Sequence, residues 1–315
     1  MMKETAIAIV GPTAAGKSDV AMRLALRMGG EIISADSMQV YKGMDIGTAK
    51  PSEEDRAAVR HHLLDVCPPD DPMSVARYCE LAKAAYDDIR SRGNVAIIAG
   101  GTGLYIDAAT RGFLFPEAEA DEGLRKRLYG RAEQEGPAVL HKELGEVDEE
   151  AALRIYPNDT RRIVRALEVY IRSGTPISRL QRQDGPKSGI PARFYGITAE
   201  RTALVKRIEA RVDKMMEDGL LDEVRRLEEL GYGSSKVAMQ AIGYKELLAY
   251  IDGSASLTEA VDRIKIETRK YAKRQMTWFK RYEDIVWHDS VTKDADTIAG
   301  LIETDFLKHT GERGG

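Results

Sequence analysis

The sequence has few of the residues that disulfide frameworks, metal clusters and membrane spans require. Only two of its 315 residues are cysteines, Cys67 and Cys79, and they lack the spacing of metal ligands. The five histidines form no HExxH motif, and the adjacent residues of the pair His61–His62 point in different directions on a helix or strand. No run of eighteen apolar residues occurs, so we expect no transmembrane helix and two reduced thiols.

The N-terminus also lacks the features of a signal peptide. Residues 1–10 hold one short apolar stretch without a small-residue cleavage site, and this stretch leads directly into a glycine motif. We interpret it as the first buried strand of the fold, and we expect a cytoplasmic protein that does not bind membranes.

Charge of one sign is not in excess, but the basic residues are unevenly distributed. The net charge of −4 argues against a generic nucleic-acid binder. Residues 154–182 nevertheless contain seven arginines against two acids, and residues 263–281 contain eight basic residues against one acid. A solvated helix face is the usual explanation of one such stretch, and a nucleic-acid surface is the alternative.

Hydrophobic periodicity predicts an α/β fold for the first third of the chain. Short apolar strands are expected at 5–10, 31–35 and 94–99, and amphipathic helices at 18–28 and 75–89. This alternation predicts a parallel sheet flanked by helices, in which ligands bind at the carboxyl ends of the strands. Asp36 and the glycine-rich segment 100–103 both follow such strand ends.

The pattern becomes purely helical after residue 116, with candidate helices at 120–135, 138–144, 149–155 and 159–172, the last capped by Asp159. A strand at 193–197 returns to the sheet. We therefore predict a catalytic core of residues 1–116 and 192–315 and a helical insertion of residues 117–191.

The C-terminal third is predicted to be mostly helical. A helical region at 203–230 is broken near Gly219, a helix at 258–281 follows, a last strand lies at 284–287, and the tail from 308 to 315 is expected to fray. On the helix at 258–281, a basic stripe should face solvent and an aromatic stripe should pack inward. The basic stripe is Arg263, Lys270, Arg274 and Arg281, and the second stripe is Ile264, Tyr271, Trp278 and Tyr282.

The most informative motif is GxxxxGK[ST], which follows the first strand and opens the first helix. Its residues are Gly11, Pro12, Thr13, Ala14, Ala15, Gly16, Lys17 and Ser18. The glycines let backbone N–H groups turn inward, and the helix N-terminus adds a positive dipole end. Lys17 brings a mobile charge and Ser18 can hold Mg²⁺. The motif therefore predicts a phosphate-binding loop.

The loop by itself does not define the reaction. Most proteins with this motif transfer or hydrolyse the γ-phosphoryl group of ATP or GTP, and they place an aspartate at the end of a neighbouring strand. Here the strand at 94–99 ends in glycine, and the acid is Asp36 on the other strand. This arrangement favours Asp36 as a general base, with a metal-holding role or a turn-capping role as alternatives.

Five further blocks carry a resemblance to a known family. They are residues 36–51 (DSMQVYKGMDIGTAKP), 100–105 (GGTGLY), 158–168 (NDTRRIVRALE), 241–246 (AIGYKE) and 272–279 (AKRQMTWF). In this order, and together with the phosphate loop, they resemble the tRNA dimethylallyltransferases, or tRNA isopentenyltransferases. Without the cysteines of a C-terminal zinc finger, the chain looks like the short bacterial form.

The resemblance implies a reaction. A dimethylallyl group passes from dimethylallyl diphosphate to N6 of adenosine 37, next to the anticodon of a tRNA, and pyrophosphate leaves with the help of Mg²⁺. The phosphate loop would hold a leaving pyrophosphate rather than ATP, which agrees with the missing strand-end aspartate. No stable protein partner is expected, and the enzyme would act as a monomer.

The resemblance also implies roles for single residues. Asp36 would be the base, Thr102 would donate to the bridging oxygen, and Arg211, which precedes an MxxxGLxDEV stretch, would bind the diphosphate. Arg207 is the second choice for that arginine, and Thr13 would donate to Asp36 or the phosphates. Contacts with tRNA are expected from Asp36, Ser37, Met38, Gln39, Thr102, Arg125, Arg161, Arg162, Ile163, Val164, Arg165, Gln240, Gly243 and Lys245.

Three other functions are compatible with parts of the sequence. A small-molecule or nucleotide kinase would use the same loop. However, this sequence lacks the strand-end acid that such a kinase needs, and a kinase has no use for an arginine-rich insertion. A non-enzymatic RNA-binding protein would not need an intact loop and Asp36. Prenylation of free AMP or ADP would leave the predicted tRNA contacts without a purpose.

Overall fold

The computed structural model of the chain describes residues 5–112, 121–182 and 189–311. The chain divides into two compact units, Met1–Arg111 with Gly189–Gly315, and Gly112–Ser188. Of the two boundaries predicted from the sequence, the one at 116/117 lies outside the described residues. The other, at 191/192, coincides with the start of a strand.

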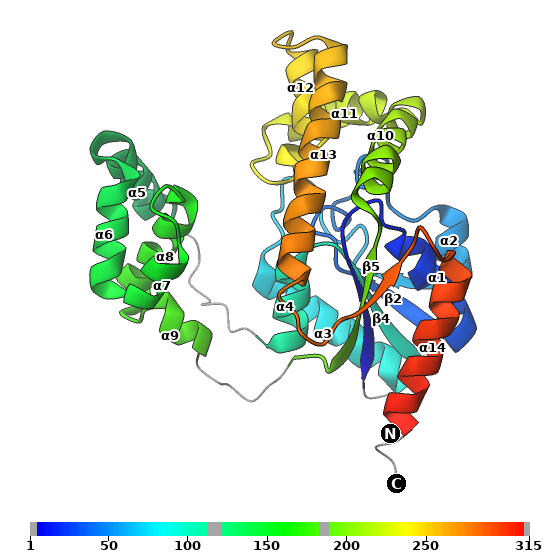
Figure 1. The fold of residues 1–315 in the computed structure, drawn as a ribbon. Coiled ribbons are helices and arrows are strands. Elements are labelled where there is room, and N and C mark those ends of the chain that lie inside the picture. The colour runs from blue at the N-terminus through cyan, green and yellow to red at the C-terminus, as the bar shows by residue number, and fades with distance from the viewer. Residues whose placement is uncertain (1–4, 113–120, 183–188, 312–315) are drawn as a thin grey trace. The chain divides into compact units, whose positions relative to one another are not determined.

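The larger unit is built on a sheet of six parallel strands (Figure 1). In sequence order they are β1 (Ala6–Val10), β2 (Gly30–Ser34), β3 (His61–His62), β4 (Val95–Gly100), β5 (Ala192–Thr198) and β6 (Val286–Asp289). Their order in the sheet is β3-β2-β4-β1-β5-β6, with β1 paired to β4 on one side and to β5 on the other. The predicted α/β class with a parallel sheet is confirmed.

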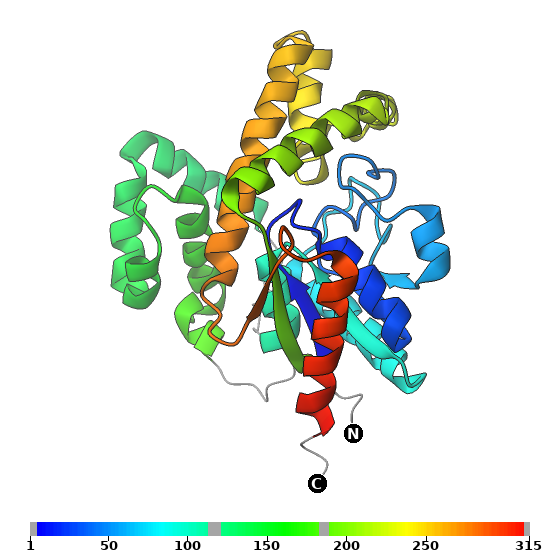
Figure 2. The ribbon, with the colours of Figure 1, turned by 45° about the vertical axis from the view of Figure 1, so that its right-hand side comes forward.

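Alternating residues of β1 face two separate hydrophobic clusters. Ile7 and Ile9 pack with buried residues of α1 (Lys17–Met28) and α14 (Ala295–Gly311). Ala6, Ala8 and Val10 belong to the cluster on the other face. A strand that is apolar at every position is therefore buried on both sides, as parallel sheets require. Figures 1 and 2 both show α14 lying along α1.

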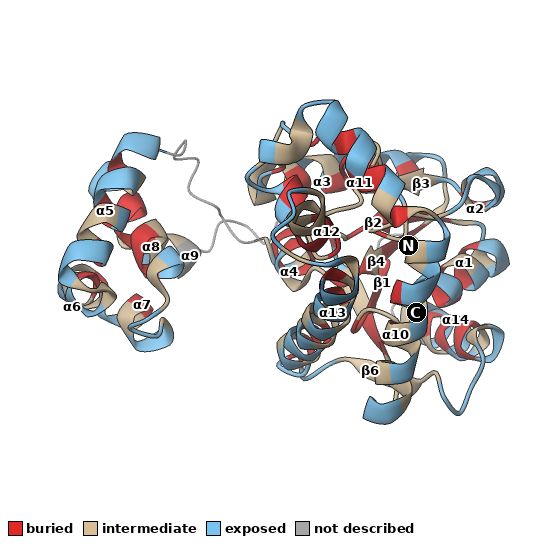
Figure 3. Cartoon of the chain, turned by 90° about the horizontal axis from the view of Figure 1, so that it is seen from above, coloured by how far each residue is buried: buried red, intermediate tan, exposed pale blue. Residues whose placement is uncertain are grey.

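The hydrophobic cluster on the opposite face of the sheet is larger and includes buried residues of six helices. They are α3 (Val75–Ser91), α4 (Gly103–Arg111), α10 (Arg201–Glu217), α11 (Leu220–Glu229), α12 (Tyr244–Ile251) and α13 (Leu257–Phe279). Short elements complete the unit, namely α2 (Glu53–Ala58) and 3-10 turns at Tyr232–Ser234 and Ala238–Gln240. Figure 3 shows that the buried residues of these helices gather on their inner sides.

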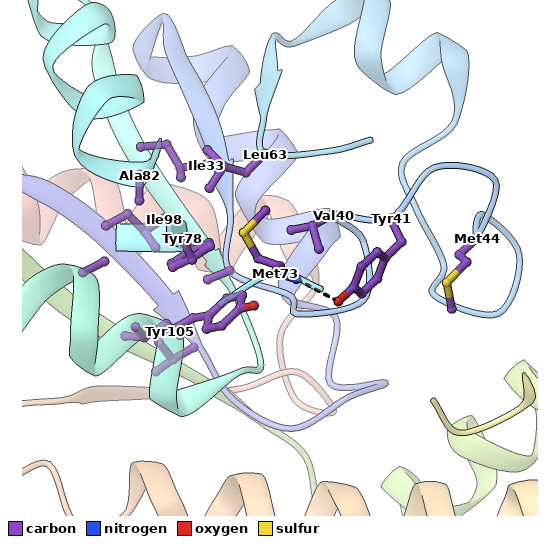
Figure 4. Packing of buried hydrophobic residues seen from close by; sticks show 14 of the residues in the cluster. Ile33, Val40, Tyr41, Met44, Leu63, Met73, Tyr78, Ala82, Ile98 and Tyr105 are labelled. Carbon is purple, nitrogen blue, oxygen red and sulfur yellow. Dashed lines mark hydrogen bonds between the residues drawn. The ribbon is translucent and has the colours of Figure 1, made fainter. Parts of the chain in front are cut away.

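Aromatic side chains fill part of this second cluster (Figure 4). The rings of Tyr78 and Tyr105 stack with centroids 3.9 Å apart. The Tyr78 hydroxyl donates to the Ser34 carbonyl at 3.0 Å, and the Tyr41 hydroxyl accepts from the Met73 N–H at 3.2 Å. The buried phenols of Tyr78 and Tyr41 thus each have a partner for their polar atom.

Helix α13 has the two stripes that its periodicity predicts. Arg263, Lys270, Arg274 and Arg281 are exposed. Ile264 and Tyr282 are buried, and Tyr271 and Trp278 are partly buried. The break predicted near Gly219 is also present, because Gly219 takes a φ of 99° between α10 and α11.

Two details of the C-terminal region differ from the prediction. Strand β6 begins two residues later than expected, because Asp284 lies in a turn. The tail predicted to fray from residue 308 is helical as far as Gly311, since α14 is anchored by the buried side chains of Ile302 and Phe306. Residues 312–315 lie outside the described part of the chain.

The described part of the smaller unit is helical. Its elements are α5 (Glu122–Glu135), α6 (Pro137–Val147), α7 (Glu149–Arg154), α8 (Thr160–Ser173) and α9 (Ile177–Arg182). Asp159 caps α8 as predicted, accepting the N–H of Arg162. The buried carboxylate of Glu168 ties the bundle together. It accepts from the Asp121 N–H and binds the guanidinium groups of Arg125 and Arg165.

Replacing Glu168 with glutamine tests how much the buried carboxylate stabilises the smaller unit. Burial raises the pKa of Glu168, but the hydrogen bonds from Arg125, Arg165 and Asp121 outweigh it, and the net pKa is lowered. A lowered pKa stabilises the fold at neutral pH, and this contribution is lost as pH falls through the folded-state value. We expect Glu168→Gln to lose about 1–3 kcal/mol of unfolding free energy at neutral pH and clearly less below about pH 4.

Urea unfolding at the two pH values measures this difference. Glu133→Gln, which changes an exposed residue of α5, is the control and should change little at either pH. Equal losses for Glu168→Gln at both pH values would contradict the ionic explanation.

Candidate active site

The loop between β1 and α1 has the backbone geometry that anion binding requires. Gly16 precedes α1 with a left-handed φ of 89°, a conformation that favours glycine. No side chain caps the first turn of α1, so its N–H groups remain available to an external acceptor. The positive end of the helix dipole points the same way. The predicted phosphate loop is therefore open at the place where a phosphate would bind.

Two partly buried cations and one carboxylate interact beside this loop. Burial and the charge of Arg211 together lower the pKa of Lys17 to about 7, although Asp36 opposes both effects. The Lys17 ammonium donates to the Pro12 carbonyl at 2.7 Å. Burial also lowers the pKa of Arg211, against the opposite effect of Asp36. An incoming anion would relieve the repulsion between the two cations.

A cavity of about 450 Å³ lies over the loop. Gly16, Lys17 and Ser18 line it from the loop and α1, and Arg207 and Arg211 line it from α10. Arg207 donates to the hydroxyl and carbonyl oxygens of Ser290 at 2.7 and 2.8 Å. The Arg211 guanidinium, in contrast, makes no hydrogen bond or ion pair with any described residue. This difference favours Arg211 over Arg207 as the ligand of an anion.

The ends of β2 and β4 bring Asp36 and Thr102 to one edge of the sheet. The Ser37 N–H donates to the Thr102 hydroxyl oxygen at 3.0 Å, and the Thr102 N–H donates to the Ala35 carbonyl at 3.1 Å. Asp36 accepts the Met38 N–H at 2.9 Å through Oδ1. One carboxylate oxygen thus holds the turn, which was the alternative role of Asp36. The other oxygen makes no hydrogen bond to a described residue, and it is available to a substrate.

Ser18 is the metal ligand that the phosphate-loop motif suggests, and its side chain is exposed at the start of α1. In the described ranges, no group of three or more His, Cys, Asp or Glu residues could hold a metal ion together. A Mg²⁺ ion at Ser18 would take its other ligands mainly from diphosphate oxygens and water, which is a common arrangement for this ion.

Gln39 and Gly243 occupy structural positions in the larger unit. The Gln39 amide accepts from the Ser34 hydroxyl and donates to the carbonyl groups of Thr48 and Ala49. Gly243 is buried, and its N–H donates to Glu246. The other predicted RNA contacts there are more accessible. Gln240 is exposed, whereas Ser37, Met38 and Lys245 are partly exposed.

In the smaller unit, the structure separates the predicted RNA contacts into two groups. Arg161 and Arg162 are exposed on α8. Ile163 and Val164 are buried in the helical core, so their contact with tRNA stays a prediction, and it would have to involve their backbone rather than their side chains. The reason is helical periodicity, which turns these two residues inward while their neighbours face solvent. Arg125 and Arg165 are half-exposed but already paired with Glu168.

Two residues without an assigned role prove to organise the site. The buried carboxylate of Glu223 accepts the N–H groups of residues 45–47 and the Tyr244 hydroxyl, at 2.6 to 3.2 Å. The Gln275 amide accepts the Thr13 N–H and donates to the Gly101 carbonyl. Thr13 was expected to donate to Asp36 or the phosphates, and no bond from Thr13 to Asp36 is present in the described structure. Gln275 and Tyr244 belong to recognised blocks, and Glu223 is the glutamate of the MxxxGLxDEV stretch.

Comparison with known proteins gives consistent matches over most of the chain. The family model described as IPP transferase matches residues 39–282. The sequence is 51% identical over 284 residues to a tRNA dimethylallyltransferase of Desulforudis audaxviator, covering 90% of this chain and 91% of the relative. It is 47% identical over 285 residues to the tRNA dimethylallyltransferase of Pelotomaculum thermopropionicum, covering 90% of each.

Solved structures agree with the sequence relatives. The full-length tRNA isopentenylpyrophosphate transferase of Bacillus halodurans matches with a TM-score of 0.71 and 40% identity, over 98% of this chain and 99% of that one. A eukaryotic dimethylallyltransferase acting on tRNA matches with a TM-score of 0.81 and 29% identity, over 97% of this chain and 80% of that one.

The lowered pKa of Lys17 predicts a pH-dependent affinity for anions. Near pH 7 part of the Lys17 population is neutral in the empty site, and an anion binds the protonated form. Inorganic pyrophosphate should therefore bind with proton uptake at Lys17, and its affinity should fall by up to about tenfold per pH unit above that pKa. Calorimetry in buffers of different ionisation enthalpy measures both effects.

Lys17→Arg is the matched variant, because arginine stays protonated in this range. The variant should lose the Lys17 part of the pH dependence while the titration of pyrophosphate itself remains in both proteins. Identical pH profiles for the two proteins would show that Lys17 is already fully charged in the empty site.

Proposed function

The chain belongs to the IPP transferase family of tRNA dimethylallyltransferases, and from this premise we propose that it transfers the dimethylallyl group of dimethylallyl diphosphate to N6 of adenosine 37 of a tRNA. The observation that carries the proposal is the grouping of Lys17, Arg211 and Asp36 beside an open phosphate loop. Cations for a leaving diphosphate and a base for an amine are the two elements that such a transfer needs.

The diphosphate end of the donor binds to the loop. The free N–H groups of the first turn of α1 receive phosphate oxygens, and Lys17 and Arg211 neutralise the charge that grows as the C–O bond breaks. Thr102 would donate to the bridging oxygen, in place of the 3.3 Å hydrogen bond that its hydroxyl donates to the Ser37 hydroxyl. Mg²⁺ held at Ser18 would supply further charge neutralisation to the phosphate oxygens.

The acceptor is an exocyclic amine whose lone pair is delocalised into the adenine ring. N6 attacks the first carbon of the dimethylallyl group, and the electron pair of the breaking C–O bond leaves with pyrophosphate. The free carboxylate oxygen of Asp36 accepts the N6 proton. An adenosine in a stacked loop has to leave the stack before it reaches Asp36, as bases do in other enzymes that modify them.

Binding of the tRNA is assigned to exposed basic residues. Arg161 and Arg162 on α8 present guanidinium groups to solvent, and arginine binds phosphates bidentately and stacks on unpaired bases. Gln240 and Lys245 would contact the anticodon stem-loop from the larger unit. A tRNA substrate agrees with a cytoplasmic enzyme, and we expect it to act as a monomer. No helix in the described part of the chain is both long and apolar enough to cross a bilayer.

The kinase alternative is less compatible with the strand ends. Strand β4, the neighbour of β1, ends at Gly100, so the usual site of a metal-binding aspartate holds no acid. The acid of this edge is Asp36 on β2, next to the turn that Thr102 holds.

The test of the reaction is incubation with dimethylallyl diphosphate, Mg²⁺ and unmodified tRNA, followed by mass measurement of the tRNA. We expect a gain of one dimethylallyl group per tRNA. Asp36→Asn should lower kcat by about 10²- to 10⁴-fold, because the general base is lost. Asp222→Asn, which changes an exposed carboxylate on α11, is the matched control.

A competent acceptor tRNA that gains no mass with the wild-type protein would refute the proposal. Transfer of a labelled γ-phosphoryl group from ATP in the same preparation would then support the kinase alternative.

The proposed tRNA contacts are tested separately. Arg161→Ala and Arg162→Ala should raise the KM for tRNA and reduce the salt dependence of binding by about one unit of slope each. The affinity for pyrophosphate should stay unchanged. Lys142→Ala removes another exposed cation of the smaller unit and is the control. An unchanged salt slope in the two arginine variants would assign these residues to a solvated surface.

A further inference from the structure

Helix α13 holds both loops of the proposed site through one side chain. Gln275 is 5% exposed. Its Oε1 accepts the Thr13 N–H of the phosphate loop at 2.8 Å, and its Nε2 donates to the Gly101 carbonyl at 2.9 Å. Both ends of the amide are therefore used, one on each loop.

The close approach of Gln275 depends on the glycine that it contacts. A Cβ atom at position 101 would lie 2.0 Å from the Gln275 Nε2 atom. Only a residue without a side chain lets the amide reach the backbone here. Gly101 and Gln275 thus fit each other although 174 residues separate them.

Tyr271 lies one helical turn before Gln275. Burial, followed by the charge of Asp36, raises the pKa of its phenol, and interactions with the side chains of Thr102 and Gln275 partly oppose this rise. The phenol therefore stays protonated at neutral pH. The Thr102 hydroxyl oxygen also accepts the Ser37 N–H, next to Asp36. Gln275 is thus bonded to Thr13 and Gly101, Thr102 is bonded to Ser37, and the Tyr271 phenol interacts with the side chains of both Gln275 and Thr102.

We infer that Gln275 and Tyr271 are positioning residues that fix the distance between the phosphate loop and the edge formed by Thr102 and Asp36. The inference rests on the proposed function, because that distance aligns the leaving diphosphate, the transferred carbon and N6. Alignment of this kind contributes strongly to rate, and an error of about 1 Å can cost about 100-fold. Neither residue needs to touch a substrate for this role.

A positioning role and a general structural role differ in how their effects combine. If Tyr271 acts through Thr102, removing the Tyr271 hydroxyl matters only while the Thr102 hydroxyl is present. The effects of Tyr271→Phe and Thr102→Ala on kcat are then non-additive. If Tyr271 only stabilises the fold, the two effects multiply.

The experiment is a double-mutant cycle on single-turnover prenylation of tRNA by the full chain. We expect Tyr271→Phe to lower kcat by about tenfold with unchanged KM values, and to have no further effect in the Thr102→Ala background. Thr268→Ala is the control, because its hydroxyl bonds only the Ile264 carbonyl of the same helix. Multiplying effects, or a loss confined to thermal stability, would overturn the inference.

Gln275 provides a second test that needs no turnover. Gln275→Leu removes the acceptor that holds the Thr13 N–H, so inorganic pyrophosphate should bind about tenfold more weakly by calorimetry. Tyr271→Phe should bind pyrophosphate like the wild type. Wild-type affinity in Gln275→Leu would overturn the inference for that residue. Absence of prenylation by the wild type itself would instead refute the proposed function, and this calorimetric result would still decide whether Gln275 shapes the loop.

Discussion

Burial of Lys17 and Arg211 next to each other is the constraint on which the rest of the site depends. Burial alone lowers the pKa of both side chains, and only Asp36 is close enough to oppose this effect on each of them. Among described residues, the Arg211 guanidinium has no hydrogen-bonding partner. Such an arrangement is unfavourable when the site is empty and becomes favourable when a dianionic or trianionic group enters. The arrangement therefore supports the proposal that a pyrophosphate binds here.

The scaffold around these charges is rigid because few side chains hold many backbone groups. Glu223 binds three consecutive N–H groups after the turn at Asp36, and Gln275 joins the phosphate loop to the loop before Thr102. Lys50 is also buried, and it bridges the carboxylates of Asp45 and Asp65. The contacts of Glu223 with residues 45–47 and those of Gln275 join segments that are far apart in the chain. They fix the loops at the carboxyl edge of the sheet before any substrate binds, and this lowers the reorganisation that the transfer requires.

The smaller unit is also held together by a buried carboxylate that binds several donors. Its carboxylate, Glu168, is buried and satisfied by Arg125, Arg165 and a backbone N–H, whereas Arg161 and Arg162 point to solvent. Arginines of one helix are therefore divided between holding the bundle and facing outward. A basic stretch in a sequence does not reveal this division, because it follows from the position of one buried acid.

The sequence by itself determined the parallel sheet, the phosphate loop, the break at Gly219 and the two stripes of α13, since these depend on local periodicity and on glycine. It also placed Asp36 and Thr102 at strand ends, where parallel strands bring their side chains to one edge. Only the tertiary structure decided that Arg211 rather than Arg207 is unpaired, that Ile163 and Val164 are buried, and that α14 continues past residue 308. It likewise revealed the hydrogen bonds of Glu223 and Gln275. Hydrogen bonds between residues more than 150 positions apart leave no local pattern, so no reading of spacing could have found them.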